Sequence, residues 1–219
     1  MKLITKKEIV PLTLIILMAV AGFLAYNKLP EQVPSHWNAS GEVDVYSSKN
    51  FAVFFAPLLA FGLWLLLICL PLIDPLRKNY QKFSKPYFAL RAALVLFLGL
   101  LYGFTLAAGL GVRINIKFFI VPSISILIAV FGFFMPKIKP NWFVGIRTPW
   151  TLQSDEVWQK THQFAGKTFV LSGLLSIFSL LFRQYSFAIF LFVVLAGALA
   201  PVAYSYFVFK QMGLFKNKK

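Results

Sequence analysis

The chain has 219 residues, of which 59% are hydrophobic and 17% aromatic, whereas only 13% are charged. A soluble domain carries roughly 25% charged residues, and a chain this apolar would expose large apolar patches in water. Its net charge of +15 comes from basic residues that lie between apolar runs and not on one compact face, which argues against direct nucleic-acid binding. Composition therefore predicts an integral membrane protein.

Six apolar runs follow one another, each near or above the length of about 17–25 residues with which a helix crosses the hydrocarbon core. These runs cover residues 9–27, 51–73, 90–111, 117–135, 168–182 and 186–209. The expected fold is an all-α polytopic bundle of six transmembrane helices. It forms one membrane domain over 1–219, in which 1–75 supply an N-terminal helix pair and 76–219 a four-helix core.

Basic residues flank the runs unequally. If the N-terminus is cytoplasmic, the basic residues on the opposite side are Lys28, Lys49, Arg113, Lys117 and Arg183, and the rest of the 22 lie on the cytoplasmic side. Cytoplasmic loops carry an excess of lysine and arginine. Both termini and the loop 137–167 are therefore predicted to be cytoplasmic, with the loop 29–49 outside.

The six runs contain no aspartate, glutamate or histidine. Transporters coupled to protons or ions usually need such a group inside the membrane. Its absence argues against a coupled transporter and leaves transport of a neutral or apolar cargo open.

The outer loop, residues 29–49, contains one of the two histidines. Pro30 and Pro34 disfavour a helix there, and 38–41 is prone to turn. His36, Glu42 and Asp44 could converge around that turn, as ligands for a zinc-like ion or as acid–base groups. Their spacing matches no known coordination motif, so we predict no metal. A structured turn and recognition of an external ligand are the other readings, and the candidate ligand-binding residues are His36, Trp37, Asn38, Glu42 and Asp44.

The inner loop, residues 137–167, holds three of the five tryptophans. Gly145 lets the backbone turn or approach a neighbour. Arg147 has five donors, which can tie the loop to several carbonyls or bind an anion. The candidate functional residues of this loop are Asn141, Gly145, Arg147, Thr148, Pro149, Trp150, Trp158 and His162.

A helix is predicted from about 155 to 165, with Ser154 as its N-cap and acidic residues in its first turn. Trp158, His162 and Ala165 would share one side of it. We expect a short amphipathic helix at the cytoplasmic interface before the fifth span. His162 there either pairs with a nearby carbonyl or carboxylate, or senses pH or takes part in catalysis.

No nucleophile–base pair, zinc-binding histidine pair or phosphate-binding glycine loop can be recognised. We therefore expect no enzymatic activity, no catalytic residue and no cofactor. A membrane metalloenzyme that uses His36, Glu42 and Asp44, or His162, remains as a minor alternative.

The two polar loops resemble a known family. In the outer loop the matching residues are Leu29-Pro30, Val33-Pro34, His36-Trp37-Asn38, Gly41-Glu42, Asp44 and Tyr46-Ser47-Ser48-Lys49. They resemble a domain of uncharacterised function that often precedes the core of the SdpI family. In the inner loop the matching residues are Asn141, Gly145-Ile146-Arg147-Thr148-Pro149-Trp150-Thr151, Trp158, Thr161-His162 and Ala165-Gly166-Lys167. They resemble the signature of that family, whose members are bacterial membrane proteins.

The resemblance implies a multi-pass protein of the bacterial cytoplasmic membrane. It implies immunity against a secreted hydrophobic peptide toxin that is met outside, and signalling by capture of a transcriptional repressor inside. The expected partners are membrane lipid, the peptide and the repressor. A small peptide transporter or exporter is the alternative.

Overall fold

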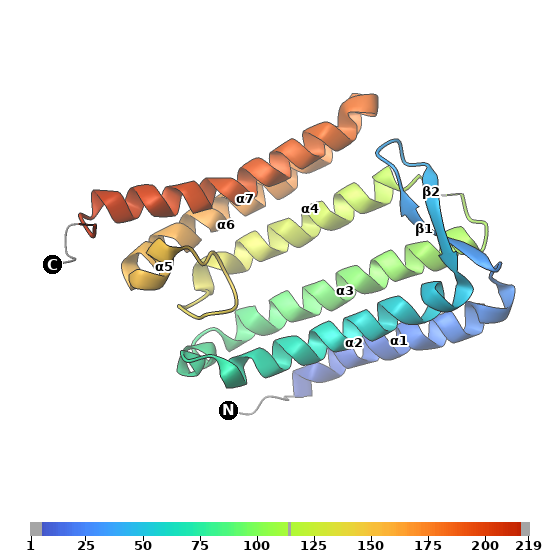
Figure 1. Ribbon diagram of the computed structural model, residues 1–219, viewed down its shortest axis with the longest axis horizontal. Helices are drawn as coiled ribbons and strands as arrows, with labels where there is room; N and C mark the ends of the chain where they lie inside the picture. The colour runs from blue at the N-terminus through green and yellow to red at the C-terminus, as the bar shows by residue number, and fades with distance from the viewer. Residues whose placement is uncertain (1–5, 114, 216–219) are drawn as a thin grey trace.

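The structure, a computed structural model, describes residues 6–113 and 115–215. Six long helices run along the bundle axis (Figure 1). They are α1 (Ile9–Ala25), α2 (Lys49–Ile73), α3 (Ser84–Gly109), α4 (Lys117–Phe134), α6 (Asp155–Ile177) and α7 (Ser186–Gln211). The shorter elements are strands β1 (Gln32–Trp37) and β2 (Val43–Ser48), helix α5 (Pro149–Gln153), and 3-10 turns at Lys6–Glu8, Tyr26–Lys28, Arg77–Gln81, Met135–Lys137 and Phe178–Tyr185.

Five segments of the described chain are long and apolar enough to cross a membrane. The last of them, Asp155–Gln211, spans 57 residues and folds back on itself. Its backbone leaves the helical conformation at Phe182 and Arg183, and Phe164 of α6 stacks on Tyr204 of α7 at 4.4 Å between ring centroids. This segment is thus the helical hairpin α6–α7, and the predicted helical membrane bundle is confirmed.

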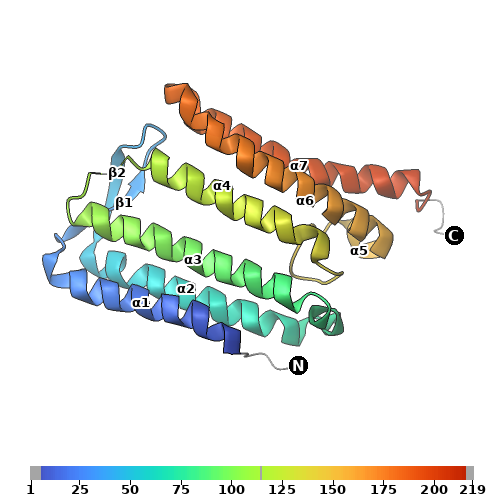
Figure 2. The ribbon, with the colours of Figure 1, turned by 180° about the vertical axis from the view of Figure 1, so that it is seen from behind.

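Each half of the chain packs its own helices together. Helices α1, α2 and α3 contact one another, as do α4 and α6 and also α6 and α7, while α3 contacts α4 (Figure 2). Helices α4 and α6 approach closely at glycines. A Cβ on Gly132 would lie 2.7 Å from the Val170 backbone nitrogen, and one on Gly173 would lie 2.6 Å from the Ser125 carbonyl oxygen. Small residues of this kind let membrane helices pack backbone to backbone.

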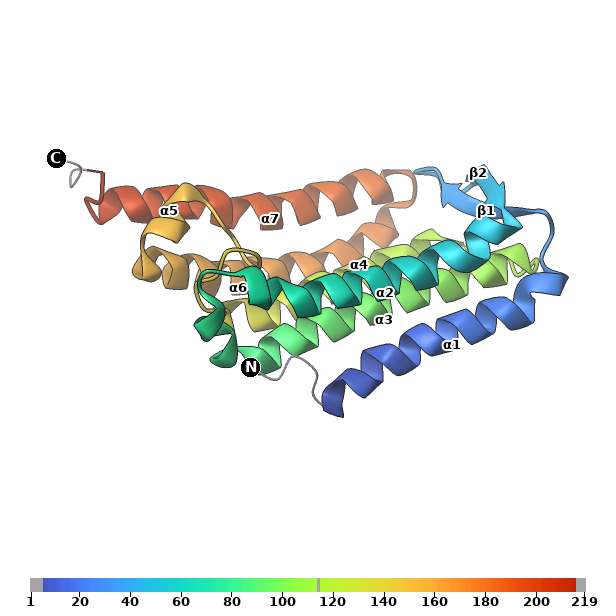
Figure 3. The same cartoon turned by 60° about the horizontal axis from the view of Figure 1, so that its bottom comes forward.

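The two ends of the bundle differ. The start of α1 and the end of α7 lie at one end, and the β1–β2 hairpin lies at the other (Figure 3). We call them the inner end and the outer end, after the orientation predicted from charge. The inner end also carries 74–83 and 135–154, and the outer end carries the α3–α4 connection and the turn between α6 and α7.

The outer loop forms an antiparallel hairpin, which differs from the irregular loop and turn expected from its prolines. Gln32 pairs with Ser48 and Val33 with Ser47, and the register becomes irregular around His36. The expected turn is present, because the Asn38 N–H donates to the Glu42 carbonyl at 2.9 Å. Val33 is completely buried and fixes the hairpin against the helices.

The expected separate interfacial helix over 155–165 is wrong. Ser154 does cap the helix, since its hydroxyl accepts from the Val157 N–H at 3.3 Å, but α6 continues unbroken to Ile177. The face that carries Trp158, His162 and Ala165 is buried and packs inside the bundle. The polar first part of α6 and its apolar second part are therefore one continuous helix. The short helix before α6 is α5.

Two ionisable residues meet inside the bundle: Glu8 lies just before the apolar run 9–27, and Arg91 lies at the start of the run 90–111. Glu8 immediately precedes α1 and Arg91 lies in α3, and their side chains form an ion pair at 2.5 Å. Both side chains are less than 10% exposed. The Trp64 indole N–H from α2 donates to the other Glu8 oxygen at 3.0 Å, so this cluster joins all three helices of the first half.

Candidate functional site

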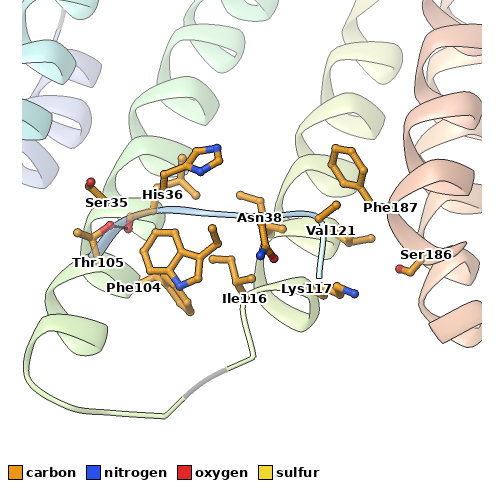
Figure 4. A pocket seen from close by; sticks show the side chains of 14 residues that line it. Ser35, His36, Asn38, Phe104, Thr105, Ile116, Lys117, Val121, Ser186 and Phe187 are labelled. Atoms are coloured by element: carbon orange, nitrogen blue, oxygen red, sulfur yellow. Dashed lines mark hydrogen bonds between the residues drawn. The ribbon is translucent and has the colours of Figure 1, made fainter. Parts of the chain in front are cut away.

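A cavity of about 310 Å³ opens at the outer end, between the hairpin and helices α3, α4 and α7 (Figure 4). Its walls are mainly apolar and include Leu101, Phe104, Ile120 and Phe187. The polar side chains that line it are Ser35, His36, Asn38, Thr105, Lys117 and Ser186. An apolar cavity with a few polar groups has the character of a ligand site.

The hairpin presents His36 at this cavity. Its Nδ1 lies 2.6 Å from the Asp44 carboxylate, with side-chain exposures of 63% for His36 and 39% for Asp44. Within the described residues Nδ1 is the ring nitrogen with a protein partner. The carboxylate therefore orients the ring and leaves Nε2 available. Trp37 packs edge-on against Phe104, with 5.2 Å between ring centroids.

The predicted outer-loop residues are thus divided between two places. His36, Trp37 and Asn38 line the cavity, and Asp44 orients His36. Glu42 stays at the turn, where the Asn38 amide points at its carboxylate from 3.5 Å. Within 6–113 and 115–215, no three histidine, cysteine, aspartate or glutamate side chains lie together as a metal site would require.

Sequence reasoning missed Ser186, the first residue of α7. Its side chain is 2% exposed, and its hydroxyl has no hydrogen-bond partner in the part of the chain that the structure describes. No local sequence pattern marks this serine, because it is distant from the hairpin in the sequence and lies at the same cavity only through the packing of α7.

At the inner end, His162 is held by two backbone groups and is completely buried. The Ile146 N–H donates to Nε2 at 3.1 Å, and Nδ1 lies 2.8 Å from the Trp158 carbonyl oxygen. A carbonyl only accepts, so Nδ1 carries the proton and the ring is the neutral tautomer. This is the predicted pairing with a carbonyl, and it uses both ring nitrogens.

Gly145 is required by the same arrangement. Its φ is +112°, and a Cβ there would lie 2.4 Å from His162 Nε2. A side chain would both strain the backbone and displace the imidazole. The predicted close approach at this glycine is confirmed.

Asn141 and Asp74 tie two inner loops together. The Asn141 amide donates to the carbonyls of Lys139 and Val144, each at 2.9 Å. The Asp74 carboxylate, 2% exposed, accepts from the Trp142 N–H and from the Tyr80 hydroxyl, each at 2.9 Å. Burial, followed by this hydrogen bond, raises the pKa of Tyr80, so its hydroxyl remains a donor. Sequence reasoning missed Asp74 and Tyr80.

Arg147 and Trp158 also make backbone contacts. Arg147 donates to the Trp142 carbonyl, which is the predicted role as a clip for the loop. The Trp158 indole N–H donates to the Ile138 carbonyl at 2.9 Å.

The remaining inner-loop residues hold α5 in place. Thr148 and Thr151 form a capping box at its start, and Pro149 is its first residue. The Thr148 hydroxyl lies 3.0 Å from that of Ser205 on α7. Trp150 packs edge-on against Tyr206 at 5.2 Å. All the predicted inner-loop residues therefore lie at one end of the bundle. The contacts described above show that they hold this end of the fold together.

Comparison with known proteins agrees with the resemblance noted in the two loops. Residues 137–205 match the SdpI/YfhL protein family, and residues 13–61 match a domain of unknown function, DUF1648. The Immunity protein SdpI of Bacillus subtilis (strain 168) is 26% identical over 208 residues, which cover 94% of this chain and 98% of that protein. No solved structure matches. The resemblance to the SdpI family, with the domain of unknown function ahead of its core, is thereby confirmed for this membrane protein.

Proposed function

We propose that the chain is an immunity protein of the bacterial cytoplasmic membrane, which protects its producer against a secreted hydrophobic peptide toxin. The observation that carries the proposal is the similarity to an immunity protein along almost the whole of both chains. The apolar cavity at the outer end supports it, because a peptide that arrives from outside reaches the hairpin first.

In the proposed action, the protein binds the peptide and catalyses no reaction on it. A hydrophobic peptide concentrates in the outer leaflet, where its apolar side chains leave water. The hairpin and the adjoining helix ends would hold the peptide there and lower the concentration free to damage the membrane. The immunity then depends on affinity and on the amount of protein.

Deletion of the gene tests the proposal. The deletion strain and its parent are exposed to purified hydrophobic peptides that related strains secrete, and growth inhibition is measured against concentration. At least one peptide should inhibit the deletion strain at a lower concentration, and restoring the gene should restore resistance. Equal sensitivity to every peptide would overturn the proposal.

Capture of a cytoplasmic repressor is the second part of the proposal. At the inner end, Trp142 is 49% exposed and Leu152 is 38% exposed, and exposed apolar groups of this kind suit a protein partner. Tagged full-length protein from peptide-treated membranes should retain a DNA-binding protein, and the variant Trp142→Ala should retain less. A retained fraction that is the same with and without peptide would contradict signalling.

Transport of the peptide is the alternative, favoured by one observation. The buried Glu8–Arg91 pair is the kind of intramembrane group that marks transport pathways. Flux of the protective peptide into proteoliposomes separates the two functions. Binding without flux supports immunity by capture, and flux that disappears in a Glu8→Gln variant that remains folded supports the transporter.

A further inference from the structure

We infer that the outer-end cavity receives one large apolar side chain of the peptide, and that the Ser186 hydroxyl bonds a peptide backbone carbonyl beside it. This inference rests on the proposed function and assigns the residues that carry it. It adds a site formed by α3, α4 and α7 to the hairpin that the sequence pointed to.

The size of the cavity selects its occupant. Its volume of about 310 Å³ lies at the small end of the range of about 300–1,000 Å³ for ligand pockets. It therefore suits one bulky side chain and not a folded peptide. Aromatic and aliphatic walls from Phe104, Ile120 and Phe187 favour an aromatic or branched aliphatic group.

The Ser186 hydroxyl indicates that the occupant also carries a polar group. Four buried side-chain atoms lack a partner among the described residues, on Arg91, Thr161, Ser179 and Ser186. Of these residues, Ser186 is the one that lines the cavity. Figure 4 shows it on the α7 side, across from His36 and Asn38 of the hairpin. Buried hydroxyl groups are nearly always hydrogen-bonded, so the described residues leave this hydroxyl without the partner that its burial calls for.

A peptide meets both requirements, whereas a hydrocarbon chain meets one. The hydrocarbon part of a lipid fills apolar space but offers no hydrogen-bonding group to Ser186. A peptide residue places a carbonyl close to its side chain and satisfies the hydroxyl while the side chain fills the cavity. His36 and Asn38, which are partly or largely exposed, lie where the adjoining peptide backbone would pass.

Two variants and two matched controls test the inference. Ile120→Trp fills the cavity, and Ile126→Trp makes the same change on the same helix at a side chain that is 59% exposed. Ser186→Ala removes the unpaired hydroxyl in the cavity. Ser179→Ala removes a second buried, unpaired hydroxyl that does not line it. The probe is the peptide to which the deletion strain proves most sensitive, bound to full-length protein in lipid nanodiscs.

Ile120→Trp should weaken peptide binding by at least about tenfold, because the indole occupies the space that the peptide side chain needs. Ser186→Ala should weaken it by about three- to tenfold, which corresponds to one net hydrogen bond. It should leave thermal stability undiminished, since the hydroxyl makes no hydrogen bond to the residues that the structure describes. Both controls should stay within about twofold of the parent.

Failure of the inference is distinguishable from failure of the proposed function. If the parent chain protects and binds the peptide but both cavity variants bind it equally well, the inference is overturned and the immunity function stands. A lipid that copurifies with the parent, is lost from Ile120→Trp and is not displaced by peptide would also overturn it. A deletion strain with unchanged sensitivity to every peptide would overturn both.

Discussion

The inner and outer ends of the bundle use their polar side chains differently. At the inner end, the side chains of Asn141, His162 and Asp74 bond backbone groups and other side chains of the protein. At the outer end, the buried Ser186 hydroxyl has no partner among the described residues, and His36 uses Nδ1 alone. The inner end holds most of the signature residues that resemble the SdpI family, although the geometry there explains much of that signature as scaffold. A dense motif is therefore not by itself a binding site.

The largest expected effect comes from Arg91→Met, which leaves the Glu8 carboxylate buried without its charge partner. Breaking a buried ion pair from one side costs about 3–5 kcal/mol, so the unfolding transition of the solubilised protein should shift strongly. The exposed pair Glu156–Lys160 provides the control, because Lys160→Met should cost at most about 0.5 kcal/mol. Equal shifts for the two variants would show that the Glu8–Arg91 pair does not hold the first three helices together.

Gly145→Ala should have the next largest effect, because the new Cβ would collide with His162 Nε2. We expect a loss of about 2–4 kcal/mol from the combined clash and backbone strain, measured by thermal unfolding. Gly111→Ala separates the two causes. Gly111 also has a positive φ, of +89°, but its Cβ would meet no atom of the described residues within 4 Å, so strain alone should cost about 1–2 kcal/mol. A Gly145 variant no worse than the Gly111 variant would contradict the described contact with His162.

Asp44→Asn should have the smallest effect on stability, because its pair with His36 is partly exposed. Such pairs contribute about 0.2–1 kcal/mol. The expected change is in peptide binding, since the amide orients the imidazole less firmly than the carboxylate does. Affinity in nanodiscs should fall by about two- to fivefold while the unfolding temperature hardly moves. A large loss of stability with unchanged affinity would contradict this role. It would show that Asp44 stabilises the fold, as the polar residues of the inner end do, and does not act in peptide binding.

The features that the sequence predicted correctly depend on neighbours along the chain. Apolar runs indicate the long helices. The acidic residues that follow Ser154 indicate that it caps a helix, and the irregular segment around Gly145 indicates a turn or a close approach there. The β1–β2 hairpin could not be predicted from the sequence, because Pro34 and the short turn around Asn38 are typical of a loop. The Glu8–Arg91 pair joins residues 83 positions apart, and Ser186 reaches the hairpin only through the packing of α7. No local pattern carries information of that kind.

Photo-crosslinking tests the difference between the two ends most directly. Benzoylphenylalanine replaces Phe187 in the cavity wall or Trp142 at the inner end, two side chains of similar exposure, 47% and 49%. The protective peptide is added to intact cells that carry the full-length protein, and crosslinked product is measured after irradiation. The account predicts a crosslink from position 187 that Ile120→Trp abolishes, and none from position 142. A crosslink from position 142 alone, or equal crosslinks from both, would contradict it.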